Sequence, residues 1–181
     1  MCSRLARLGL AAAACFAAVE PAGAADPENT LLIDLSTGGR VVIEMLPEIA
    51  PKHVARIKEL AREGFYDGIV FHRVIEGFMA QTGDPTGTGT GGSGRGGLPA
   101  EFSKVPFERG VVGMARTREP NSADSQFFIM FARAPHLDGQ YTVWGRVIEG
   151  MEFVDKIART EPRRPARLDR MVKVRVAADQ R

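Results

Sequence analysis

Residues 71–84 read FHRVIEGFMAQTGD, a run that starts with β-rich residues and ends with glycine and polar residues. If the run begins as a strand, alternation places Arg73 on one face with Phe71 and Ile75. An arginine among large apolar side chains is costly unless its charged end reaches water, a cleft or a partner. The run alone leaves two hypotheses for Arg73: a structural arginine that snorkels or forms a salt bridge, or a functional arginine at a cleft.

The sequence on either side predicts a mainly β fold with two helices. Leu31–Leu35 and Arg40–Leu46 are β-rich, and the Ser-Thr-Gly-Gly between them is a hairpin signal. One helix is predicted from Pro51 to the residues before Gly64, and a second over about Met151–Arg159. Because helices and strands do not alternate regularly, we expect a closed antiparallel barrel with helices at its ends. The other predicted strands are Ile69–Val74, Val111–Ala115, Phe127–Phe131, Thr142–Val147 and Val172–Val176.

The first 25 residues have the pattern of a signal peptide. Arg4 and Arg7 precede an uncharged stretch, Leu8–Val19, and Ala22-Gly23-Ala24 is a small-residue pattern that signal peptidases cut. The stretch is shorter than the roughly 20 residues of a membrane-spanning helix. A buried N-terminal helix is the less favoured alternative. We therefore predict a signal peptide at 1–25, a mature domain at 26–181, no integral membrane span, and export to the periplasm of a bacterium.

Both cysteines, Cys2 and Cys15, lie inside this first segment. Cleavage after Ala24 or Ala25 would leave a mature chain without a thiol, a disulfide or a cysteine metal site. Such a chain is compatible with an oxidising compartment. The three alanines before Cys15 weakly resemble a lipoprotein cleavage site. Anchoring through a lipidated Cys15 is therefore a second, minor hypothesis for the N-terminus.

Charge and motif spacing argue against several other classes of protein. The formal net charge is +2, so no general attraction to nucleic acid is implied. His53, His72 and His136 lack the short spacing of a zinc site, and there is no G-x-S-x-G motif. Residues 86–97, TGTGTGGSGRGG, match G-x-G-x-x-G, but Leu98-Pro99 follows instead of a helix. We expect a flexible surface loop beside a binding groove there, and no metal or cofactor.

A second run, Ser125–Met130 (SQFFIM), completes a family pattern. Together the two runs resemble the signature segments of the cyclophilins, FHRVIxGFMxQxGD and NxxxSQFFI. The resemblance extends from about Leu31 to Val176 and includes the YDG turn at Tyr66 and the later LDG and V-x-G-x-V segments. It implies a closed eight-stranded antiparallel barrel capped by two α-helices, with a substrate groove on its outer face.

The function implied by this resemblance is peptidyl-prolyl cis-trans isomerisation. The expected partners are proline-containing unfolded or partly folded polypeptides, and with the predicted export this means assistance to the folding of exported proteins. We expect a monomer. Two other classes stay open: a binding or chaperone module that uses the same groove without turnover, and a nucleotide-binding protein that uses the Gly-rich loop.

Carried over by position, the resemblance also implies the roles of particular residues. Arg73 corresponds to the catalytic arginine and Gln81 to the neighbour that orients it. Arginine suits such a role because it stays charged and carries a rigid fork of donors. The expected substrate-binding residues are Phe78, Met79, Phe128 and Leu137 for the proline ring, Ala115, Arg116 and Gln126 for the preceding residue, and His136 and Tyr141 at the rim.

Four positions depart from the family pattern. His136 stands where many members carry a tryptophan linked to tight cyclosporin binding, so we expect weak cyclosporin binding with catalysis retained. Tyr141 stands where histidine is frequent, and its flat ring and single hydroxyl predict retained activity. Arg116 replaces a common asparagine and either serves through its backbone or favours acidic residues beside the proline. Thr82 replaces a usual glycine.

Overall fold

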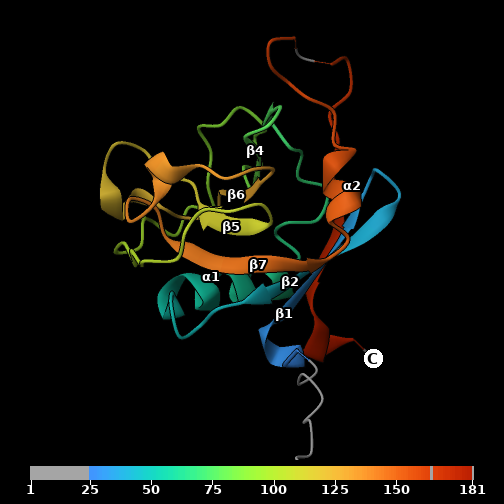
Figure 1. The fold of residues 1–181 in the computed structure, drawn as a ribbon. Helices are drawn as coiled ribbons and strands as arrows, with labels where there is room; N and C mark the ends of the chain where they lie inside the picture. The colour runs from blue at the N-terminus through green and yellow to red at the C-terminus, as the bar shows by residue number, and fades with distance from the viewer. Residues whose placement is uncertain (1–24, 164, 181) are drawn as a thin grey trace, which may run out of the picture.

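The computed structural model describes residues 25–163 and 165–180. The signal-peptide and lipidation hypotheses concern residues that lie almost wholly outside this range. The described residues form the expected mainly β fold with two α-helices (Figure 1). The strands are β1 (Thr30–Leu35), β2 (Gly39–Met45), β3 (Arg73–Ile75), β4 (Met79–Thr82), β5 (Val111–Met114), β6 (Phe127–Met130), β7 (Val143–Glu149) and β8 (Met171–Val176), and the helices are α1 (Pro51–Arg62) and α2 (Met151–Asp155).

All eight strands belong to one antiparallel sheet in the order β3-β4-β6-β5-β7-β2-β1-β8. The expectation of a closed barrel is wrong, because no strand ladder joins β8 to β3. The two ends of the sheet meet through single contacts, such as the bridge between Val70 and Arg170 and the bond from Phe71 N–H to the Asp169 carbonyl (2.8 Å). The sheet is therefore an open, eight-stranded half-barrel.

The edge of β3 explains why the ladder does not close. This strand has only three residues. The residues after α2 occupy its outer edge, where Thr160 N–H donates to the Val74 carbonyl (2.9 Å). Helix α2 ends at Asp155, four residues before the predicted end. The strand predicted at Ile69–Val74 starts only at Arg73, and β4 was not predicted as a strand.

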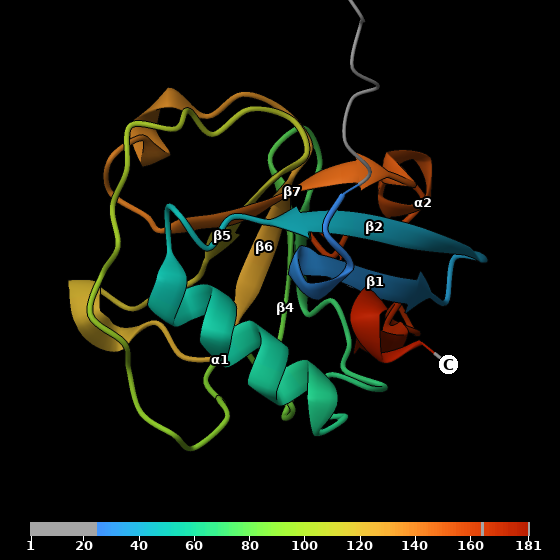
Figure 2. The ribbon, with the colours of Figure 1, turned by 90° about the horizontal axis from the view of Figure 1, so that it is seen from below.

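Helix α1 lies across one end of the half-barrel, with α2 on the other side of the sheet (Figure 2). Pro51 sets its first turn, and its buried face carries Val54, Ile57 and Leu60, as predicted. Its N-cap residue makes no side-chain cap hydrogen bond. Instead, the Glu101 carboxylate accepts bonds from the N–H groups at positions 52 and 53 (both 3.1 Å), which also places a negative charge at the positive end of the helix.

The same carboxylate contacts a buried histidine. His53 Nδ1 lies 2.6 Å from Glu101 Oε2. Within the described residues, Nε2 of His53 is buried without a hydrogen-bond partner. Burial lowers the pKa of His53, and this effect outweighs the opposite effect of the Glu101 carboxylate. The neutral ring is therefore the form that the folded protein favours.

We expect His53 to make the protein less stable below neutral pH. Because its pKa is lowered on folding, the unfolded chain binds an extra proton as pH falls through the ordinary histidine value of about 6.5, at up to about 1.4 kcal/mol per pH unit. Urea unfolding of the wild type and of His53→Gln at about pH 7.5 and 5.5 measures this. The wild type should lose more stability than the variant. Equal slopes for His53→Gln and wild type would contradict the assignment.

Two apolar clusters lie on opposite faces of the sheet at β6. Phe127 and Ile129 point into the barrel core, where the Phe127 ring meets Trp144 edge-on at 5.4 Å between centroids. Phe128 and Met130 belong to a second buried cluster on the other face. This alternation means that β6 is apolar on both faces. Trp144 thus fills part of the barrel core, and the outer cluster forms an apolar floor on the other face of the sheet.

Candidate active site

The outer cluster opens into a small pocket of about 110 Å³. Nine of the eleven residues predicted for the site line it: Arg73, Phe78, Met79, Gln81, Ala115, Arg116, Phe128, Leu137 and Tyr141. Gln126 lines the adjoining pocket instead. His136 lines neither pocket, although its ring centroid lies 5.6 Å from that of Phe78. The fold thus assembles residues that are up to 68 positions apart in the chain into one apolar hollow.

Aromatic packing fixes the floor of this pocket. The Phe128 ring stacks on Phe107 at 5.7 Å and meets Tyr141 edge-on at 5.9 Å. A Cβ atom at Gly113 would lie 2.6 Å from the Phe107 ring and 2.7 Å from that of Phe128. Glycine at this position of β5 therefore lets both rings pack against the sheet. The result is a rigid apolar wall for a ring-shaped ligand.

Arg73 lies at the rim of the same pocket. Its side chain is 48% exposed, and Nε donates to Glu161 Oε1 at 3.2 Å. Phe71 is buried in the barrel core, so the prediction that it shares a face with Arg73 is wrong, because β3 begins only at Arg73. Arg73 thus has the ion pair expected of a structural arginine, and it also lies at the edge of a cleft. Its functional role stays a prediction.

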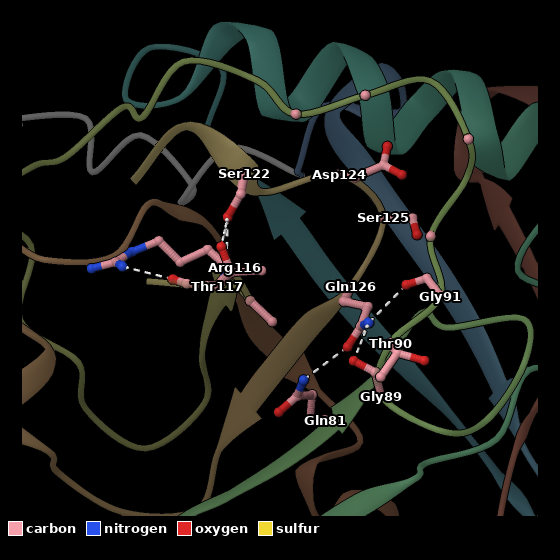
Figure 3. Close-up of a pocket in the computed structure, with 15 residues that line it drawn as sticks. Gln81, Gly89, Thr90, Gly91, Arg116, Thr117, Ser122, Asp124, Ser125 and Gln126 are labelled. Atoms are coloured by element: carbon pink, nitrogen blue, oxygen red, sulfur yellow. Dashed lines mark hydrogen bonds between the residues drawn. The ribbon is translucent and has the colours of Figure 1, made fainter. Parts of the chain in front are cut away.

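Gln81 lies opposite Arg73 in the β3–β4 register, but its amide turns to another glutamine. Gln81 Nε2 donates to Gln126 Oε1 at 2.9 Å, and Gln126 Nε2 donates to the carbonyls of Gly89 (3.0 Å) and Gly91 (2.8 Å), as Figure 3 shows. Within residues 25–163 and 165–180, Gln81 makes no hydrogen bond to Arg73. The expected orienting contact is thus absent here, and Gln81 instead connects the pocket floor to the Gly-rich loop.

The Gly-rich loop forms one wall of a larger pocket of about 680 Å³, and Gln81, Ala115 and Arg116 line both pockets. It is tied down at its start by Asp84, a buried carboxylate that accepts backbone N–H groups from Thr86 (2.7 Å), Thr88 (3.1 Å), Gly89 (2.6 Å) and Gly91 (3.1 Å). Burial alone would raise the pKa of Asp84, but these hydrogen bonds hold it far below its usual range. The loop lies beside a groove as expected, with more internal anchoring than its composition suggests.

A second carboxylate holds the far side of this loop. Asp124 accepts the Ser93 backbone N–H at 2.6 Å and the Arg56 guanidinium Nη1, also at 2.6 Å. Asp124, Ser122 and Thr117 also line the larger pocket (Figure 3). None of these residues was singled out from the sequence. The loop therefore joins α1 and the β5–β6 connection into one polar wall.

The Arg116 guanidinium hydrogen-bonds to backbone carbonyls of the neighbouring loops. Nε and Nη2 donate to the Gln140 carbonyl at 3.1 and 2.8 Å, and Nη1 donates to the Thr117 carbonyl at 3.0 Å. The guanidinium carbon also lies 4.5 Å from the centroid of the Tyr141 ring. This geometry favours the hypothesis that Arg116 serves the groove through its backbone, with its side chain fixing the loops at either side.

The site combines an apolar floor with two arginines, Arg73 and Arg116. Among the described residues no group of three or more histidine, cysteine or acidic side chains is placed to hold a metal ion. No helix of the described part is long and apolar enough to cross a membrane. Glu161 is the hydrogen-bond partner of Arg73 that the sequence did not reveal, because 88 positions separate the two residues and nothing in the local sequence of Glu161 marks it.

Comparison with known proteins agrees with this geometry. The family model "Cyclophilin type peptidyl-prolyl cis-trans isomerase/CLD" matches residues 32–177. A probable peptidyl-prolyl cis-trans isomerase of Brucella suis biovar 1 (strain 1330) is 52% identical over 191 residues, which cover 96% of this chain and 97% of that protein.

Two solved structures share the fold. The cyclophilin AquaCyp293 from Hirschia baltica has a TM-score of 0.77 and 32% identity over 86% of this chain and 76% of that one. A cyclophilin-type isomerase from Cryptosporidium parvum, crystallised in the presence of the dipeptide Ala-Pro, has a TM-score of 0.75 and 28% identity over 81% of this chain and 98% of that one. The chain therefore belongs to the cyclophilin-type peptidyl-prolyl cis-trans isomerases and is an enzyme of that activity.

Proposed function

We propose that this isomerase rotates X-Pro bonds in unfolded or partly folded exported polypeptides, with Arg73 as its catalytic residue. The observation that carries the proposal is a half-exposed guanidinium at the rim of an apolar pocket. The four predicted proline-pocket residues Phe78, Met79, Phe128 and Leu137 all line that pocket. The site thus places an apolar pocket for a ring directly beside a cationic hydrogen-bond donor.

The reaction needs no nucleophile and no general base. Amide resonance sets a barrier of about 18–20 kcal/mol to rotation of the X-Pro bond. A catalyst must hold the proline ring, let the preceding residue turn, and favour the twisted amide, in which the nitrogen regains its lone pair. Lowering the barrier by about 7 kcal/mol corresponds to roughly 10⁵-fold acceleration.

The residues of the site divide these tasks. The aromatic floor at Phe128 holds the ring by shape and apolar contact. The Arg73 guanidinium donates toward the nitrogen as it becomes a better acceptor, an interaction that strengthens in the transition state. Ala115 and Arg116 line both pockets and Gln126 lines the larger one, which we assign to the chain that precedes the proline. The Ala-Pro dipeptide used with the Cryptosporidium protein supports recognition of this unit.

The cellular setting is part of the proposal. We propose that residues 1–25 are a signal peptide, that residues 26–181 act in the periplasm as a monomer, and that lipidation of Cys15 is the alternative at the N-terminus. Mass spectrometry of the protein recovered from cell fractions tests this directly. A mature chain starting near residue 25 or 26 supports export, a lipid-modified Cys15 supports anchoring, and an intact Met1 in the cytoplasmic fraction contradicts both.

Refolding of a proline-limited client protein tests the folding role. The wild type at substoichiometric concentration should accelerate the slow, proline-limited phase, because each enzyme molecule turns over many X-Pro bonds. Arg73→Ala should leave that phase slow. A holding chaperone would raise the yield without changing the rate, and it would do so equally in both proteins. Acceleration by wild type and Arg73→Ala alike would remove the proposed catalytic role.

The rim of the pocket should determine the response to cyclosporin. His136 is exposed and lies against Phe78, where an indole would add apolar surface and a hydrogen-bond donor. We expect weak binding by the wild type and at least about tenfold tighter binding, some 1.4 kcal/mol, by His136→Trp. Inhibition constants on a proline peptide measure both. Nanomolar inhibition of the wild type would contradict this expectation.

A further inference from the structure

The residues Arg159–Glu161 lie along the outer edge of β3 in a fixed register. Thr160 is buried, its N–H donates to the Val74 carbonyl at 2.9 Å, and its hydroxyl accepts the Val74 N–H at 2.8 Å. On one side of this anchor Arg159 Nε donates to Glu76. On the other side Glu161 meets Arg73. These two hydrogen bonds between Thr160 and Val74 therefore set which residue lies beside Arg73 at the pocket rim.

The contact between Glu161 and Arg73 uses only one donor of the guanidinium. Nε donates to Glu161 Oε1 at 3.2 Å, and the two side chains are 51% and 48% exposed. Within residues 25–163 and 165–180, the terminal nitrogens of Arg73 make no hydrogen bond. An exposed arginine samples many rotamers, and a partner on Nε restricts them while leaving the terminal N–H groups for a ligand.

We propose that Glu161 is a positioning residue, which holds the Arg73 guanidinium at the pocket rim with its terminal N–H groups presented to the substrate amide. This inference rests on the proposed catalytic role of Arg73. The alternative is that the Glu161 carboxylate draws the guanidinium away from the substrate and slows turnover. In that case, removing the carboxylate would raise kcat instead of lowering it. Gln81, which was expected to orient the arginine, is engaged with Gln126 instead.

The expected effect falls on turnover rather than on substrate binding. Glu161→Ala should lower kcat about three- to fivefold, the range that a solvent-exposed ion pair supplies, with KM unchanged. Glu161→Gln keeps an oxygen acceptor for Nε and should restore part of the loss. Glu76→Ala is a matched control, because Glu76 is also an exposed glutamate paired with an arginine Nε on the same segment. It should keep the wild-type kcat and KM.

Two further measurements show whether Glu161 acts through the arginine. In the Arg73→Ala background, Glu161→Ala should cause no additional loss of kcat. The NMR resonance of the Arg73 Nε–H group, assigned by its absence from Arg73→Lys, should move in Glu161→Ala and stay in place in Glu76→Ala.

Several results would overturn the inference. A wild-type or increased kcat in Glu161→Ala contradicts positioning, and so does an equal loss in the Arg73→Ala background. An unmoved Nε–H resonance contradicts the contact itself. If Arg73→Ala loses turnover while Glu161→Ala does not, only the role of Glu161 is removed. Full turnover by Arg73→Ala removes the catalytic assignment and the positioning role together.

Discussion

Replacing Arg73 by alanine is expected to lower kcat/KM for a proline peptide by about 10²- to 10³-fold, the usual cost of removing a donor that stabilises a transition state. The apolar pocket survives this change, because Phe128 and Leu137 are held by their own cluster. Peptide binding should therefore weaken much less than turnover. A protease-coupled assay on an Ala-Pro-Phe peptide measures the loss.

Two variants serve as controls for this result. Arg73→Lys keeps the positive charge but loses the planar fork, so it should recover only a small part of the activity. Arg146→Ala removes an exposed arginine of β7 that pairs with Glu44 and lines neither pocket, and it should behave as wild type. If Arg146→Ala lost as much activity as Arg73→Ala, a general effect of charge would replace the local one.

Replacing Asp84 by alanine should cause the largest loss of stability, about 3–5 kcal/mol of the free energy of unfolding, because several donors lose a buried carboxylate acceptor at once. Gly89 and Gly91 give their N–H groups to Asp84 and their carbonyls to Gln126. Loosening them should also raise KM for peptides that extend before the proline. Urea unfolding and steady-state kinetics measure the two effects.

The pH dependence of Asp84 has a definite sign. Its pKa is lowered on folding, so its contribution to stability is complete above the ordinary aspartate value of about 3.9 and is lost as pH falls below that value. Asp84→Ala should therefore show a shallower loss of stability in acid than the wild type.

Asp67→Ala is the control for the size of the stability loss. Asp67 accepts one backbone N–H, from Val174, and removing its carboxylate should lower the free energy of unfolding by about 1 kcal/mol. Equal costs for Asp67→Ala and Asp84→Ala would contradict the anchoring role.

Local patterns in the sequence predicted a mainly β fold with two helices, and the resemblance to a known family supplied most of the pocket residues. The hairpin at residues 36–39 and helix α1 follow from turn and apolar periodicity that neighbouring residues determine. The pocket residues were carried over by position from the resemblance of two motifs to the cyclophilin segments. The structure adds that alternation in β6 sends Phe128 outward while Phe127 enters the core. The roles of these residues remain proposals, but their assembly in one place is a structural fact.

What the sequence did not predict depends on contacts between distant segments. Closure of the barrel fails because Thr160 occupies the edge of β3, 86 positions from Val74. The partner of Arg73 is likewise distant in sequence and lies in a loop without a recognisable pattern. Asp84 is an exception: its anchoring role was not predicted although its hydrogen-bond partners begin two residues later, and an aspartate before threonines and glycines is a typical turn signal.

The central claim is that a guanidinium at the rim of an apolar pocket catalyses rotation of the X-Pro bond. Exchange NMR on an Ala-Pro peptide tests it without a coupling protease, because cis and trans resonances exchange visibly only when the bond is catalysed. Catalytic amounts of the wild type should produce exchange cross-peaks. Arg73→Ala should still shift the peptide resonances by binding but produce no cross-peaks. Wild-type exchange by Arg73→Ala, or none by the wild type, would contradict the account.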